Sequence, residues 1–214
     1  MRINTYYLTV LPAAFFLLPM TAQSQQTQRF KAGIIAGVTA SQIDGDESAG
    51  YHKIGLQAGL KGIAILKPKQ QASVEILYTQ RGCRNEPETY PLYNTTLNYI
   101  EVPLQWHYSD WLVEAGDEAD NFYRVQFNVG ASWSYLLGYK DKYEDGFGIA
   151  AALPDLNKNS FCGMLGISFY ATKNIGFTFR WQRAFNNLYT PKDGTNYASS
   201  LNEHSLTFQT MFVF

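Results

Sequence analysis

Beyond its first residues this chain has no apolar run of the roughly eighteen residues that a membrane-spanning helix needs. It also has almost no net charge, because 17 basic residues face 18 acidic ones. This balance excludes the basic surface that nucleic-acid-binding proteins use, so no nucleic-acid partner is expected. Any membrane crossing would have to be made by strands.

Cysteine and histidine are scarce, at two and three residues. Neither a CxxC motif nor a metal-ligand spacing occurs, so we predict no redox chemistry, no metal site and no cofactor. Cys83 and Cys162 leave two possibilities in an exported protein: one disulfide that staples the outer connections, or two free thiols. His52, His107 and His204 form no readable Ser/His/Asp arrangement, so we predict no catalytic residues and no enzyme activity.

The first 24 residues have the composition of a secretory signal peptide. Arg2 provides the positive start, residues 8–18 the apolar core, and Ala22-Gln23-Ser24 a cleavage site with small residues. The apolar core is shorter than the roughly 20 residues of a spanning helix, which favours a cleaved signal over an anchor. We expect residues 1–24 to be removed and residues 25–214 to form one exported domain.

The chain is rich in aromatic residues, at 15%, which suits the aromatic girdles of a membrane barrel. Its last segment, residues 203–214, is an alternating strand that ends on an aromatic. One face carries Leu206, Phe208, Phe212 and Phe214, and the other carries Ser205, Thr207 and Gln209. The barrel-assembly machinery of bacterial outer membranes reads a last strand of this kind, so Phe212 and Phe214 are the candidate assembly signal.

Eight segments in all alternate apolar and polar residues with period two. They are residues 31–41, 53–66, 72–83, 97–108, 123–137, 161–171, 176–184 and 203–214. The connections after the first, third, fifth and seventh are long and those after the second and sixth are short, as in outer-membrane barrels. The pattern predicts an all-β fold, an eight-stranded antiparallel up-and-down transmembrane β-barrel in the bacterial outer membrane. Pro103 within a strand and a long acidic turn at residues 109–122 do not fit this pattern.

Four stretches carry a family resemblance. They are Phe30-Lys31-Ala32-Gly33, Gly55-Leu56-Gln57-Ala58-Gly59, Glu75-Ile76-Leu77-Tyr78-Thr79-Gln80-Arg81-Gly82 and Tyr99-Ile100-Glu101-Val102-Pro103-Leu104. In this order they resemble the PorT-like outer-membrane β-barrel domain of Bacteroidetes, over about residues 30–214. The resemblance implies an eight-stranded barrel, often described as a porin-family protein, and it accounts for Glu101 and Pro103 in mid-strand. It implies a fold and a location, and no reaction.

The polar faces of the strands carry a cluster of mixed charge: Lys61, Glu75, Arg81, Glu101, His107 and Arg180. An eight-stranded barrel is about wide enough for side chains to fill its interior. Because unpaired buried charges are costly, we predict that these groups pair across the lumen and plug it. The alternative is that they line a narrow passive pore.

The long connections, residues 85–96, 138–159 and 186–202, are the expected place for recognition. We therefore expect a structural or binding protein whose partners are outer-membrane lipid, the barrel-assembly machinery and an unidentified extracellular or periplasmic molecule. A soluble, lipocalin-like exported carrier of a small apolar ligand is a further alternative. Such a carrier would have to turn its large apolar face inward, around a narrow lumen.

Overall fold

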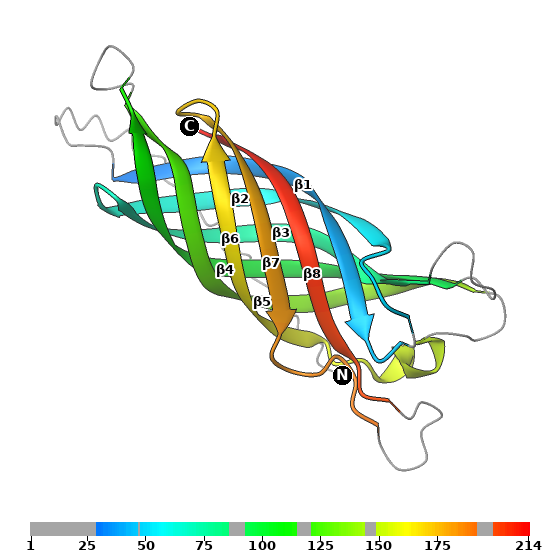
Figure 1. Cartoon of the computed structure of the whole chain (residues 1–214). Coiled ribbons are helices and arrows are strands. Elements are labelled where there is room, and N and C mark those ends of the chain that lie inside the picture. The colour runs from blue at the N-terminus through cyan, green and yellow to red at the C-terminus, as the bar shows by residue number, and fades with distance from the viewer. Residues whose placement is uncertain (1–28, 47, 86–92, 115–120, 144–148, 192–198) are drawn as a thin grey trace, which may run out of the picture.

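The computed structural model describes residues 29–46, 48–85, 93–114, 121–143, 149–191 and 199–214. Eight antiparallel strands pair in sequence order, and the last closes on the first to form a barrel (Figure 1). The elements are β1 (Phe30–Asp44), β2 (Lys53–Lys67), β3 (Gln70–Arg84), β4 (Tyr93–Val113), β5 (Phe122–Tyr143), the 3-10 helix η2 (Ala150–Asp155), β6 (Asn159–Tyr170), β7 (Ile175–Ala184) and β8 (Asn202–Val213). The predicted signal peptide, residues 1–24, lies outside the described residues. No helix in the described part of the chain is long and apolar enough to cross a membrane.

The two ends of the barrel differ. At the end that holds the C terminus, here called the terminus end, β2 turns tightly into β3 and β6 into β7 (Figure 1). At the opposite end, here called the loop end, lie the longer connections after β1, β3, β5 and β7, together with η2. This asymmetry is the one that the lengths of the connections predict, with the predicted exception of the long connection between β4 and β5, which joins these strands at the terminus end.

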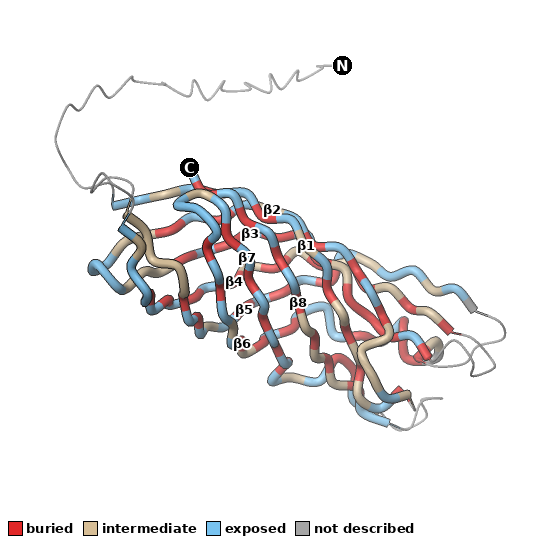
Figure 2. The backbone as a smooth tube through the Cα atoms, turned by 45° about the horizontal axis from the view of Figure 1, so that its top comes forward, coloured by how far each residue is buried: buried red, intermediate tan, exposed pale blue. Residues whose placement is uncertain are grey.

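Buried and exposed residues alternate along every strand (Figure 2). Over residues 175–182 of β7 the exposed set is Ile175, Phe177, Phe179 and Trp181, and the buried set is Gly176, Thr178, Arg180 and Gln182. Successive side chains of a strand point to opposite faces, so the apolar set covers the outside and the polar set lines the lumen. Apolar exposure on this scale suits lipid and not water, and it is the reverse of what a lipocalin-like carrier needs.

The predicted fold and the order of the strands are confirmed, but β4 and β5 are longer than predicted. Residues 109–113, which we predicted as a turn, and residues 93–96 and 138–143, which we predicted as loops, belong to these strands. At the loop end Thr95 still pairs with Asp141, and Thr96 with Lys140. The main-chain ladder continues where the outer face becomes polar, because strands that project into water need no apolar face.

Pro103 lies inside β4, facing the lumen. Its register with Ser132 of β5 is regular, whereas the pairing with β3 steps from Leu104 to Glu101 and omits Val102 and Pro103. Proline has no N–H to donate, so one of the two ladders must be interrupted beside it. The interruption is local, and β4 continues through it.

Candidate functional site: the lumen

Glu75 is the centre of one group of charges in the lumen. Its carboxylate lies 3.0 Å from the Lys61 ammonium nitrogen and accepts a hydrogen bond from Arg180 Nη2 at 3.0 Å. The same Arg180 nitrogen donates to Gln105 Oε1 at 3.1 Å. Each of the three charged side chains is at most 4% exposed. The carboxylate therefore compensates two buried cations at once.

Arg81 is the centre of a second group, nearer the loop end. Its guanidinium is paired with Glu101, and its Nη1 lies 3.6 Å from Glu203 Oε1. It also lies over the ring of Tyr99, 5.3 Å from the centroid, and a Gln182 amide oxygen turned toward it accepts from Arg81 Nε at 3.1 Å. Taken together, the two groups contain three cations, on Lys61, Arg81 and Arg180, and three carboxylates, on Glu75, Glu101 and Glu203.

Neutral polar side chains extend the hydrogen-bonded network of the lumen. Thr79 donates to Glu101 Oε2 at 3.2 Å and accepts from Gln57 at 2.8 Å, and Gln57 in turn accepts from Gln209. His107 Nε2 lies 2.7 Å from the Ser73 hydroxyl oxygen, and both residues are buried. Buried polar atoms that bond one another avoid much of the cost of leaving water.

An apolar cluster lies across the loop end of the lumen, and we call it the loop-end plug. It consists of Ile43, Cys83, Tyr93, Leu97, Tyr99, Leu136, Ile149, Ala152, Leu153, Leu156, Leu188, Tyr189 and Leu201. A backbone hydrogen bond from Leu136 N–H of β5 to Lys158 C=O at 2.8 Å joins it to the wall, and one from Asn157 N–H to Leu188 C=O at 2.7 Å joins two of its connections. Beside it Tyr93 donates to the backbone oxygen of Asp46 at 2.9 Å, and burial raises the pKa of the Asp46 carboxyl.

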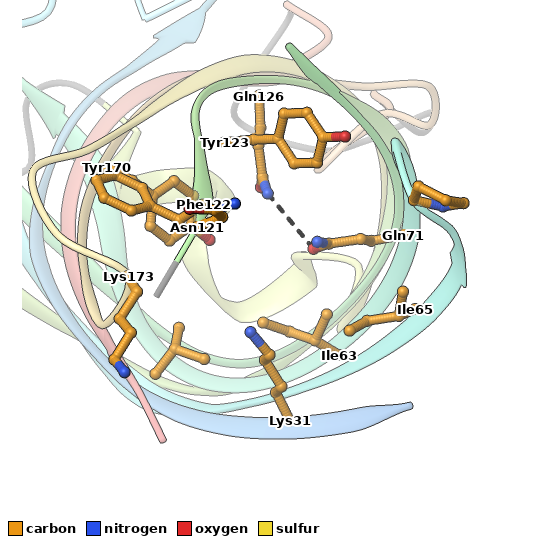
Figure 3. Close-up of a pocket in the computed structure, with 12 residues that line it drawn as sticks. Lys31, Ile63, Ile65, Gln71, Asn121, Phe122, Tyr123, Gln126, Tyr170 and Lys173 are labelled. Atoms are coloured by element: carbon orange, nitrogen blue, oxygen red, sulfur yellow. Dashed lines mark hydrogen bonds between the residues drawn. The ribbon is translucent and has the colours of Figure 1, made fainter. Parts of the chain in front are cut away.

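A second apolar cluster lies toward the terminus end, formed by Ile35, Ile63, Leu77, Tyr170, Met211 and Val213, with Phe122 packed on it. Next to this cluster, at the terminus end, the barrel opens into a recess of about 190 Å³ (Figure 3). Lys31, Gln71 and Gln126 line this recess together with Ile63 and Tyr170, and Gln126 donates to Gln71 at 3.4 Å. The polar middle of the lumen thus lies between two apolar clusters.

All six residues of the predicted lumen cluster face the lumen and are buried. The structure brings five of them into two charged groups, and His107 pairs with Ser73 instead. Sequence reasoning missed Glu203. This residue begins the last strand and has the same parity as Ser205 and Thr207, so a strict count along the strand would have found it.

Of the two possibilities left open for the cysteines, the structure has the pair of free thiols and not the disulfide. Cys83 and Cys162 are both free and buried. They come from β3 and β6, which do not pair, and each thiol has other neighbours. Cys83 belongs to the loop-end plug, while Cys162 Sγ lies 3.5 Å from the Ser160 hydroxyl and 3.9 Å from Arg81.

Phe212 and Phe214, the candidate assembly signal, lie at the terminus end with their side chains outward. They are 45% and 61% exposed, and their ring centroids are 6.4 Å apart. They extend the apolar outer face to the last residue of the chain.

A family model agrees with this geometry. Residues 21–190 match a family model described as outer membrane protein beta-barrel domain. A comparison with curated proteins finds no match.

Similar solved structures include Ail, the attachment invasion locus protein of Yersinia pestis, with 12% identity and a TM-score of 0.42 over 86% of this chain and 98% of that one. Neisserial surface protein A has 12% identity and a TM-score of 0.43 over 86% and 97%. The outer membrane protein AlkL in lipid bilayers has 8% identity and a TM-score of 0.43 over 99% and 97%.

Proposed function

Because this chain belongs to the outer membrane protein beta-barrel domain family, we propose that it is a closed, non-conducting barrel with a structural or binding role at its loop end. The observation that carries this proposal is the content of the lumen, where three buried cations meet three buried carboxylates beneath an apolar plug. We also propose that the protein is of the PorT-like type, on the strength of the stretch from Tyr99 to Leu104.

The packing of the lumen supports a closed barrel over a narrow pore. A conducting path needs polar groups that stay in contact with water from one mouth to the other. Here the charged groups are almost fully buried, bonded to one another, and bounded by apolar clusters toward both ends. An ion would have to displace these contacts and cross the loop-end plug, and both steps oppose conduction.

The shape of the loop end supports recognition as the role. The paired β4 and β5 project there with polar residues, including Asn94, Thr96, Lys140 and Lys142. The connection that contains η2 packs against the barrel through buried leucines. Loops and strand ends held by a rigid scaffold are the usual place for binding. The ligand would be an extracellular molecule that reads this polar surface.

A non-catalytic role fits the surroundings of the histidines. The Ser73–His107 pair is buried in the lumen, where no substrate has access, and the Nδ1 atom of His107 has no hydrogen-bond partner among the described residues. A Ser–His pair without an orienting third group and without access to substrate lacks what nucleophilic catalysis requires.

Conductance in a planar bilayer tests the closed lumen. We expect the purified, refolded protein to give no stepwise currents under conditions in which an open porin inserted in the same bilayer conducts. The protein should migrate faster on SDS gels before boiling than after, which establishes that the sample is folded. Regular single-channel steps from the folded sample would contradict the proposal and favour the narrow pore.

A further inference from the structure

A trough crosses the membrane-facing side of the barrel over β5, β6 and β7. Its floor includes Gly163 of β6, which is in register with Ala131 of β5. Gly163 in turn pairs with Arg183 of β7. The Phe185 ring lies over Gly163, where an added Cβ would come within 2.5 Å of it. The resulting hollow measures about 550 Å³, and its lining includes Val129, Gly163, Leu165, Trp181, Arg183 and Phe185.

The trough continues toward the terminus end. A second hollow of about 280 Å³ shares Val129 and Leu165 with the first and adds Trp106 and Phe127. Arg183 is the one charged residue among those that line the two hollows. The trough is therefore lined by apolar residues along most of its length, and its single cation lies on the side toward the loop end.

Arg183 ends the apolar outward series of β7, and beyond its row β6 and β5 present the outward aromatic residues Phe161 and Trp133. Toward the terminus end the outward residues of β7 are Ile175, Phe177, Phe179 and Trp181, and Arg183 follows them. The neighbouring strand β8 changes in the same way, from Leu206 to His204. The boundary between the apolar core of the membrane and its headgroups should therefore lie near this row.

Arg183 has room to bind a headgroup. Its guanidinium contacts Asp44 at 3.4 Å, and the two side chains are 56% and 42% exposed, so water screens the pair. Asp44 also accepts from His204 Nε2 at 2.9 Å, and Tyr51 bonds the other ring nitrogen at 2.8 Å. A guanidinium has five N–H donors, and among the described residues the contact to Asp44 is the only one that engages them.

We propose that this trough binds one acyl chain of an anionic membrane lipid and that Arg183 holds the phosphate of its headgroup. The apolar floor accepts a hydrocarbon chain, and an arginine at the headgroup boundary complements a phosphate. Lipid is the apolar molecule that surrounds a membrane barrel at this depth. This inference depends on the placement in the membrane and is independent of the proposed role of the loop end.

Quenching of Trp181 by brominated acyl chains tests the proposal. Trp106, Trp111 and Trp133 are replaced by Phe, so that Trp181 alone reports. The parent variant is reconstituted in bilayers that contain brominated phosphatidylglycerol or brominated phosphatidylcholine in an unlabelled background. The contact between Arg183 and the phosphate is a single charge pair screened by water. We therefore expect the trough to favour the anionic lipid over phosphatidylcholine by about threefold or more, measured as stronger quenching of Trp181 by brominated phosphatidylglycerol.

Two matched pairs of variants separate the parts of the site. Arg183→Gln should abolish the preference, whereas Lys140→Gln, which removes an exposed cation at the loop end away from the trough, should keep it. Gly163→Leu should displace Phe185 and fill the trough, which reduces quenching by both lipids. Ala58→Leu also introduces a leucine, at an outward position on β2 away from the trough, and should change nothing. Heat-dependent migration on SDS gels shows that each variant is folded.

Three results would overturn the proposal. The first is equal quenching by the two lipids in the parent variant. The second is a preference for the anionic lipid that survives in Arg183→Gln. The third is a Trp181 that neither lipid quenches, which would mean that another protein surface, such as a second copy of the chain, covers the trough.

Discussion

At the scale of single residues, we expect the stability of the barrel to depend most on one buried carboxylate that compensates two cations. Glu75 touches both Lys61 and Arg180 in a part of the lumen where all three side chains are nearly inaccessible. Removing one partner of a buried ion pair leaves the other charge buried without compensation, and that costs more than the pair contributes. The stability of the barrel should therefore depend strongly on Glu75.

We expect Glu75→Gln to lower the free energy of unfolding by about 3–5 kcal/mol, because it leaves two buried cations facing a neutral amide. Urea unfolding in detergent micelles, followed by tryptophan fluorescence, measures the change. Asp110→Asn is the control, since Asp110 pairs with Lys69 at 3.2 Å on an exposed surface and should cost less than about 1 kcal/mol. Equal losses for the two variants would show that the charges in the lumen are not interdependent.

At the scale of elements, β8 contributes to the polar lumen with one face and to the lipid-facing surface with the other. Its inward residues Glu203, Ser205, Thr207 and Gln209 belong to the lumen, while Phe208, Phe212 and Phe214 face lipid. Closure of the barrel requires this strand to pair with both β7 and β1. Phe212 is in register with Ile34 and Ile175, and the Phe214 N–H donates to the Ala32 carbonyl at 2.8 Å, so these residues pair through their main chain. Their outward rings take no part in the ladders and suit a role in recognition by the assembly machinery.

We expect Phe214→Ala to lower the amount of folded protein in the outer membrane of cells severalfold while leaving refolding into detergent nearly unchanged. Heat-dependent migration of the membrane fraction and of the refolded sample measures the two quantities. The control is Phe208→Ala, an outward aromatic of the same strand whose ring stacks on Phe177 with centroids 6.2 Å apart. If both variants lost the same amount in cells, the terminal residue would have no special role.

The other element with a distinct task is η2, which carries Leu153 into the loop-end plug. Leu153 is 6% exposed, and truncating a buried leucine removes packing worth about 2–5 kcal/mol. Since η2 lies outside the strand ladder, this loss should open the plug and leave the barrel closed.

We expect Leu153→Ala to accelerate proteolysis of the connection between β5 and β6 while the heat-dependent migration of the barrel persists. Mapping of the fragments by mass spectrometry locates the cleavage. Asp155→Ala, a change at an exposed position of the same helix, should leave the rate unchanged. Loss of the folded band in Leu153→Ala would mean that the plug is needed for the barrel itself.

At the scale of the whole molecule, the connections at the two ends of the barrel differ in length and chemistry. This difference implies one orientation in the membrane. Long connections of outer-membrane barrels face outward, and short turns face the periplasm. The loop end with Lys142 should therefore lie outside the cell, and the turn with Lys69 inside. Both native thiols are buried, so an introduced cysteine can report its own location.

We expect a membrane-impermeant maleimide to label Lys142→Cys in intact cells and Lys69→Cys only after the outer membrane is permeabilised. Gel mobility after labelling provides the measurement, and the unmodified chain, with only Cys83 and Cys162, is the blank. The reverse pattern would invert the orientation, and it would place the polar loop end in the periplasm.

The sequence alone determined the number of strands, their order and the direction in which each face points. These properties are local, because a period of two fixes which side chains share a face once one face is apolar. The same rule assigned Lys61, Glu75, Arg81, Glu101, His107 and Arg180 to the inside. The rule predicted β4 and β5 too short, because both strands continue into water beyond the point where their apolar alternation ends.

Only the tertiary structure decided which of those side chains meet. Lys61 and Glu75 are cross-strand neighbours, but Arg180 reaches Glu75 from across the lumen, 105 residues away in the chain. Tyr51 and Asp44 meet His204 where β1 closes on β8, which brings together residues more than 150 positions apart in the chain. The trough over Gly163 depends on the register of three strands and on where Phe185 lies. Contacts of this kind follow from the closure and stagger of the barrel, and a pattern read along a single strand carries no record of them.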